Sequence, residues 1–203
     1  GSIDFVFTDP PFGDFIPYAE VNQINELWLN HTTDREKEII ISPSQEKSVA
    51  DYQCMLTRVF TEISRVLKPD HYAAVVFHAA KAKIWEAFEH AILDSGLAVC
   101  MTSILDKKQS SFKQVVSSGS VQGDPLVLLK TAEQEKNNVM RDQHILDMLL
   151  TEVYVSGNVD ERRIYSLYVN ECLKRGQVVA LDAKDAYDYI RNCVERYSDE
   201  INE

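Results

Sequence analysis

The sequence predicts an α/β fold followed by a helical appendage, and three features of its hydrophobic pattern support this. Up to residue 130, short runs of β-branched and aromatic residues alternate with stretches whose apolar residues recur every three or four positions. The last two strand-like runs, 97–105 and 125–130, have no helical stretch between them, which favours an antiparallel pair. Beyond residue 140 the pattern is helical. We expect 1–134 to hold parallel strands closed by an antiparallel hairpin, and 135–203 to be the appendage.

The first strand is expected over residues 3–8, whose sequence is IDFVFT. The motif Asp9-Pro10-Pro11-Phe12-Gly13 ends it, because proline has no N–H to continue a ladder and glycine permits a tight turn. A helix is expected over 17–29, where the spacing of Tyr18 and Trp28 predicts that both belong to the core. Residues 30–49 are polar and predict an irregular connection.

The later elements follow from the same periodicities. A helix from Ala50 to Leu67 is expected to end at Lys68-Pro69-Asp70, before a buried strand from Tyr72 to His78. A second helix is expected from Lys81 to Ser95, before the hairpin strands. In the appendage, Asp160 and Asp182 are predicted N-caps, and Gly176 is a predicted helix stop.

Composition and charge exclude several classes of protein. The net charge of −11 argues against a large phosphate-binding face, because affinity for nucleic acid backbones comes mainly from Lys and Arg. No apolar run reaches the ~18 residues of a membrane span. Gly1-Ser2 and the missing initiator Met indicate a chain that starts inside a longer protein, without a signal peptide. The four cysteines form no CxxC motif, so we expect reduced core thiols in a cytoplasmic protein and no metal site: Cys54, Cys100, Cys172 and Cys193.

The motif after the first strand can act on an amine. The exocyclic NH2 of a nucleobase is a poor nucleophile, since its lone pair is delocalised into the ring. Asp9 and the backbone carbonyl of Pro10 can accept its two hydrogens and favour positive charge on nitrogen in the transition state. Pro10 and Pro11 make the loop rigid, Phe12 offers a flat face to a flipped base, and Gly13 lets the backbone turn beside it. The competing interpretation is a simple Pro-Pro turn with Phe12 in the core.

Other residues are weaker candidates. His78, at the end of the second strand, can line the base or cofactor pocket, although a histidine without a chemical role is the more frequent case. Ser118, Gly119 and Ser120, with Gly13, can form a substrate loop. Three lysines of the hairpin loop can contact phosphate, or simply face solvent: Lys107, Lys108 and Lys113.

Residues 3–13 resemble the catalytic strand and loop of the N6-adenine and N4-cytosine DNA amino-methyltransferases, where Asp, Asn or Ser precedes Pro-Pro and an aromatic residue. The resemblance extends less specifically to the helix end at 65–69, the strand at 72–78 and the hairpin, and so covers residues 3–130. It implies a doubly wound, Rossmann-like methyltransferase sheet, S-adenosylmethionine as methyl donor, base flipping and DNA as partner, as in restriction-modification or phage-defence systems. It assigns the amine chemistry to four residues only: Asp9, Pro10, Pro11 and Phe12.

The chain departs from the family at the cofactor motif. It has seven glycines but no Gly-x-Gly, so the resemblance indicates a partial domain that carries the catalytic loop without the methionine-binding half. We expect the isolated chain to be inactive, and its exposed sheet edges to favour self-association. Methyltransferases of RNA bases or of protein glutamine use the same acceptor chemistry and remain alternatives. A non-catalytic α/β interaction domain is the third.

Overall fold

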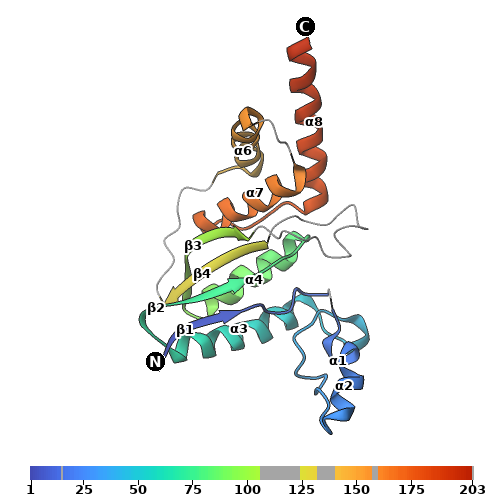
Figure 1. The fold of residues 1–203 in the computed structure, drawn as a ribbon, viewed down its shortest axis with the longest axis vertical. Helices are drawn as coiled ribbons and strands as arrows, with labels where there is room; N and C mark the ends of the chain where they lie inside the picture. Colours follow the sequence, from blue (N-terminus) through green and yellow to red (C-terminus); the bar gives the residue numbers. More distant parts are fainter. Residues whose placement is uncertain (15, 106–123, 132–139, 157–159, 203) are drawn as a thin grey trace.

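A computed structural model of the chain describes residues 1–14, 16–105, 124–131, 140–156 and 160–202. Within them, four strands form an open sheet in the order β1 (Ile3–Thr8), β2 (Leu67–Val76), β4 (Asp124–Thr131), β3 (Leu97–Leu105) (Figure 1). β1 and β2 are parallel, and β4 runs antiparallel to both of its neighbours, β2 and β3. The predicted α/β class and the antiparallel closing pair are therefore confirmed.

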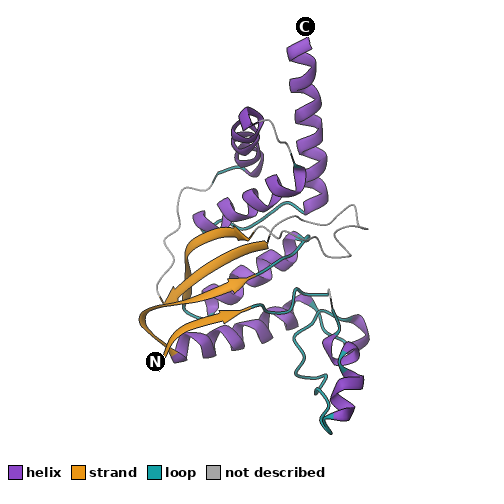
Figure 2. Cartoon of the chain, in the orientation of Figure 1, coloured by secondary structure: helices purple, strands orange, loops and turns teal. Residues whose placement is uncertain are grey.

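Helices connect the strands and build the C-terminal part of the chain (Figure 2). The longest helix of the N-terminal part begins at a capping box, in which Ser48 and Asp51 satisfy each other's backbone N–H groups. The described helices are α1 (Tyr18–Val21), α2 (Gln23–Trp28), the 3-10 turn η1 (Pro43–Gln45), α3 (Val49–Val66), α4 (Ala82–Asp94), α6 (Asp142–Ser156), α7 (Glu161–Arg175) and α8 (Ala183–Asn202).

The parallel pair fixes where the candidate loop lies. β1 pairs with β2 so that Phe7 lies beside Ala74 and Thr8 beside Val75, and α3 connects the two strands. Both strands therefore end at the same edge of the sheet. The motif that follows Thr8 and the residues that follow Val76 are neighbours at this edge. His78 is one of these residues, and its place at the end of the second strand had suggested that it lies near the motif.

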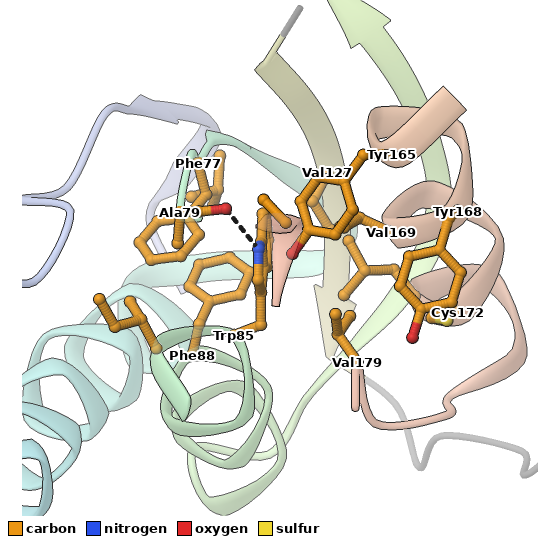
Figure 3. Packing of buried hydrophobic residues seen from close by; sticks show 14 of the residues in the cluster. Phe77, Ala79, Trp85, Phe88, Val127, Tyr165, Tyr168, Val169, Cys172 and Val179 are labelled. Carbon is orange, nitrogen blue, oxygen red and sulfur yellow. Dashed lines mark hydrogen bonds between the residues drawn. The ribbon is translucent and has the colours of Figure 1, made fainter. Parts of the chain in front are cut away.

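One face of the sheet carries the hydrophobic core. Side chains of β2 and β4 on this face join residues of α3, α4 and α7 in one buried cluster. Its centre is aromatic: the Phe77 ring stacks on Phe88 at 4.1 Å between centroids and meets Trp85 edge-on at 5.0 Å. Figure 3 shows these rings beside Val127, with the Trp85 Nε1–H donating to the Ala79 carbonyl oxygen at 2.9 Å.

The opposite face has large apolar side chains in contact with water. Alternate residues of a strand point to opposite faces, so Phe5 and Phe7 of β1 lie on the same side as Tyr72 of β2 and Met101 of β3. All four are exposed, and Phe7 is 65% exposed. Parallel strands in α/β proteins are normally covered on both faces, so this surface is unusual for the fold class.

The C-terminal helices join the same core. The cluster continues from the sheet into α7. Figure 3 shows three of the α7 residues that belong to it, Tyr165, Tyr168 and Val169. Asp160 caps α7 by accepting from the Arg162 N–H at 3.0 Å, and Gly176 ends it in the left-handed conformation, as predicted. The carbonyl of Asp182 accepts from Ala186 as an N-cap carbonyl does. Its carboxylate caps α4 instead, accepting from the Ala82 N–H at 2.6 Å.

Several predictions about single elements were wrong. β2 begins at Leu67 rather than Tyr72, because α3 passes directly into the strand and a positive φ of 59° at Asp70 lets it continue past Pro69. Tyr18 and Trp28 are not core residues, since they are 42% and 87% exposed.

The cysteine prediction holds for two residues only. Cys172 and Cys193 are buried, whereas Cys54 and Cys100 are exposed. Cys54 lies on α3 between residues that face the core, and helical spacing turns it toward solvent. Among the described residues, every helix is too short or too polar to cross a membrane.

Candidate functional site

The loop after β1 begins where the proline pair ends the ladder. Asp9 is exposed to solvent, Pro10 is buried and Pro11 is half-buried. An exposed acidic residue therefore stands at the carboxyl end of a parallel strand, and the proline after it is buried in the protein. This is the arrangement that the motif predicts for a carboxylate acting on a bound molecule.

Three polar contacts hold the loop to the rest of the fold. The Tyr52 hydroxyl donates to the Pro11 carbonyl oxygen at 2.5 Å, and the Ile41 N–H donates to the Gly13 carbonyl oxygen at 3.1 Å. The Lys81 ammonium pairs with the Asp14 carboxylate at 2.7 Å. Burial raises the pKa of Tyr52 above its ordinary value, so its hydroxyl stays protonated and remains a donor. The loop is thus anchored from α3, from the connection before η1 and from the residue before α4.

Gly13 is required by its backbone. Its φ of +75° lies in the left-handed region, which strains residues that carry a Cβ. An added Cβ would also lie 2.8 Å from the Cδ1 atom of Ile84, so the adjoining side chain would have to shift. The predicted role of Gly13 as a turn residue is confirmed. A direct role in binding substrate stays a prediction.

Phe12 is half-buried and packs on two aromatic neighbours. Its ring meets Phe77 edge-on at 5.6 Å between centroids and lies tilted against His78 at 6.0 Å. Phe77 belongs to the central aromatic cluster, so Phe12 connects the loop directly to the core. The simple-turn interpretation explains this contact as well as the base-stacking interpretation does, and stacking on a base stays a prediction.

His78 lies beside the loop, two residues after the end of β2, and contacts Asp124 at the start of β4. The His78 Nδ1 atom is 3.0 Å from the Asp124 Oδ1 atom. The sheet register explains the pairing: Val76 lies opposite Leu126, so two residues further on His78 comes opposite Asp124. The Phe77 N–H donates to the Pro125 carbonyl oxygen at 3.1 Å and extends the ladder between them.

The contact between His78 and Asp124 is close but does not form a hydrogen bond. The two side chains are only 14% and 3% exposed, so the contact lies largely out of water. The ring N–H is not directed at the carboxylate well enough for a hydrogen bond, even at 3.0 Å. The contact is therefore an electrostatic one between the imidazole and the carboxylate rather than a hydrogen bond.

Some predicted residues lie outside the part of the chain that the structure describes. Ser118, Gly119 and Ser120 of the proposed substrate loop belong to 106–123, as do three lysines proposed for phosphate contact: Lys107, Lys108 and Lys113. Residues 132–139, where the two predicted parts of the chain meet, lie outside it as well. Among the described residues, no three His, Cys, Asp or Glu side chains gather in a way that could hold a metal ion.

Sequence reasoning missed three residues of the site: Asp124, Tyr52 and Lys81. Asp124 was assigned to a polar loop, although its place directly before a predicted strand was a usable signal. Tyr52 lies in the helix predicted from Ala50 to Leu67, and its hydroxyl had no predicted partner. Lys81 was expected only to begin a helix. All three contacts join segments that are distant in the sequence.

A cavity of about 150 Å³ lies elsewhere, between α4, β3 and α7. Glu89 lines it, and burial raises the pKa of this carboxyl group to about 8. Its Oε1 atom is buried without a hydrogen-bond partner. This cavity is on the helix-covered side of the sheet and belongs to different elements from the loop after β1.

Comparison with protein-family models, with curated proteins and with solved structures found no match for the chain.

Proposed function

We propose that the chain carries the amine-binding half of an S-adenosylmethionine-dependent methyltransferase that acts on adenine or cytosine in DNA. One observation carries the proposal: Asp9 is exposed at the carboxyl end of a parallel strand, in a loop anchored from three other segments. The order and directions of the strands also fit the catalytic half of a Rossmann-like methyltransferase sheet. β1 and β2 are parallel, and the closing pair is antiparallel.

The loop supplies two hydrogen-bond acceptors to an NH2 group. The Asp9 carboxylate takes one hydrogen and the Pro10 carbonyl the other, which keeps the nitrogen lone pair directed at the methyl donor. The anchors at Pro11, Gly13 and Asp14 hold these acceptors in place before substrate arrives. Because positive charge develops on nitrogen during the transfer, both acceptors stabilise the transition state more than the ground state.

The methyl donor is a second substrate, and the described residues show no glycine-rich turn that could hold it. Among the described glycines, Gly96 follows the end of α4, Gly176 ends α7, and Gly13 packs against the Ile84 side chain. None of these opens a glycine-rich turn between a strand and a helix. The proposal therefore assigns donor binding to a segment with a Gly-x-Gly loop, which this sequence lacks.

The test is methyl transfer by the full-length protein that contains this chain. Labelled S-adenosylmethionine would be supplied with unmethylated DNA, with RNA and with protein in separate reactions. The proposal expects label in DNA, at an adenine or cytosine amine, and none with the isolated 203-residue chain. Label in RNA or protein alone would replace DNA with one of the alternative substrates.

The decisive variant is Asp9→Ala. Loss of one acceptor is expected to lower kcat by at least about 10²-fold, whereas Asp9→Asn keeps an acceptor oxygen and should retain part of the rate. Glu20→Ala removes an exposed carboxylate of α1 and serves as the matched control. Unchanged methylation by Asp9→Ala would favour the non-catalytic interaction domain, for which the net charge of −11 also argues.

A further inference from the structure

His78 lies between a buried carboxylate and the loop after β1. The sheet order places β4 on one side of β2 and β1 on the other. At the end of β2, the Nδ1 side of the His78 ring faces Asp124 of β4. The same ring contacts Phe12 of the loop that follows β1. The imidazole therefore bridges the two neighbouring strands at the edge of the sheet where the acceptor loop lies.

The second ring nitrogen follows from this orientation. Nδ1 and Nε2 lie on different sides of an imidazole, so with Nδ1 next to Asp124 the Nε2 atom is directed away from β4. A carboxylate beside Nδ1 favours the tautomer that carries hydrogen there and leaves a lone pair on Nε2. In this tautomer His78 can accept a proton at Nε2, and its ring lies against Phe12 of the loop after β1.

Methylation of an amine needs such a base. When the NH2 nitrogen forms its bond to the methyl carbon, the carbon–sulfur bond breaks and its electron pair goes to sulfur. The nitrogen then carries a positive charge and still holds both of its hydrogens, whereas the neutral methylated product holds one. Asp9 and the Pro10 carbonyl can accept hydrogen bonds in this state, but the product is neutral only after one proton has left.

We propose that His78 takes this proton at Nε2 and that the Asp124 carboxylate stabilises the imidazolium that forms. The inference rests on the proposed function and adds two residues to it. No charge is created without a partner, because the proton moves from a cationic nitrogen to an imidazole already beside a carboxylate. The burial of Asp124 strengthens the attraction, since the contact is screened little by water.

The experiment measures kcat and KM for DNA with the full-length protein. His78→Gln is expected to lower kcat by about 10²-fold, with KM for DNA within about threefold, because general base catalysis typically contributes 10² to 10⁴. His71→Gln, near the other end of β2, is the matched control and should keep the wild-type rate. A His78→Gln rate within threefold of wild type would overturn the inference.

Chemical rescue separates a base from a structural residue. His78→Ala should be slow in buffer and regain at least tenfold in rate when imidazole is added, since the small molecule can accept the proton in the space left. A variant that is merely misfolded would show no rescue and a lower melting temperature by circular dichroism. Absence of rescue in a folded His78→Ala protein would also contradict the inference.

Asp124→Asn tests the partner. Its rate should fall about tenfold, and the double variant His78→Gln/Asp124→Asn should be no slower than His78→Gln alone, because the carboxylate acts only through the imidazole. A double variant whose loss of rate equals the product of the two single losses would contradict this role for Asp124. Asp9→Ala distinguishes the two proposals: if it abolishes methylation while the His78 variants stay active, only the present inference fails. If wild type methylates nothing, both fail.

Discussion

The two faces of the sheet place the same residue type in opposite environments. Phe77, just after β2, is fully buried under α3 and α4 and touches three other aromatic rings. Phe7 of β1 is 65% exposed on the other face. Phe7 belongs to one strand of the parallel pair and Phe77 directly follows the other, and their rings lie on opposite sides of the sheet. We therefore expect the covered face to contribute most of the stability of the described fold and the open face little of it.

This asymmetry also explains how the candidate site is built. Phe12 rests on Phe77, so the loop after β1 is attached to the covered face and takes its rigidity from it. His78 and Asp124 continue the strand positions of the open face, where they follow Val76 and precede Leu126. The site therefore lies at the edge where the two faces meet, with Phe12 packed on the covered side and Asp9 exposed.

The largest expected effect is on the covered face. Phe77→Ala should lower the free energy of unfolding by about 3–5 kcal/mol, because it removes the ring at the centre of the aromatic cluster and leaves a cavity. Urea denaturation followed by circular dichroism would measure it. The matched change Phe7→Ala should stay within about 0.5 kcal/mol of wild type. Equal losses for the two variants would show that the open face is covered in solution.

An intermediate effect is expected at Glu89, on the covered side. Burial raises the pKa of its carboxyl group from 4.5 to about 8 in the folded protein. Below about pH 4.5 the group is protonated in both states. As pH rises toward 8, the unfolded chain releases the proton while the folded chain keeps it, so the stability associated with the neutral group is lost.

Glu89→Gln keeps the shape of the side chain and removes its ionisation. The variant should match wild type near pH 4.5 and be more stable by a few kcal/mol at pH 8.5, because glutamine has no proton to lose and each pKa unit is worth about 1.4 kcal/mol. Thermal melts at several pH values would show the divergence. Asp94→Asn, exposed at the end of the same helix, is the control and should not change the slope. Parallel pH profiles for Glu89→Gln and wild type would contradict the buried position of Glu89.

Local pattern was sufficient to locate most elements of the sheet and its helices. The strand expected over 97–105 has those bounds, and the helix expected from Ala50 to Leu67 occupies Val49–Val66. These predictions succeed because both elements bury a periodic apolar set against the same core. The position of the motif after β1 could be predicted for a similar reason, since a Pro-Pro pair must end a strand.

Features that depend on what covers a surface could not be predicted. The spacing of Trp28 indicates a helix with an apolar side, but spacing does not say whether another segment packs on it, and Trp28 is 87% exposed. The pairing of His78 with Asp124 requires β4 to lie beside β2, which local periodicity does not specify. Asp182 shows the same limit, because it was expected to cap its own helix and its carboxylate caps α4.

The smallest predicted effect concerns the start of α3, the helix that connects the two parallel strands and helps cover their buried face. Ser48→Ala removes the hydroxyl that accepts from the Asp51 N–H and should cost about 1 kcal/mol of unfolding free energy. Ser44→Ala is the control, since its hydroxyl contacts only Ser42 among the described polar contacts and caps no helix. If α3 is needed to keep Phe77 buried, Ser48→Ala should lose most of its effect in a Phe77→Ala background, where the cluster is already weakened. Full additivity would show that the cap stabilises the helix independently of the covered face.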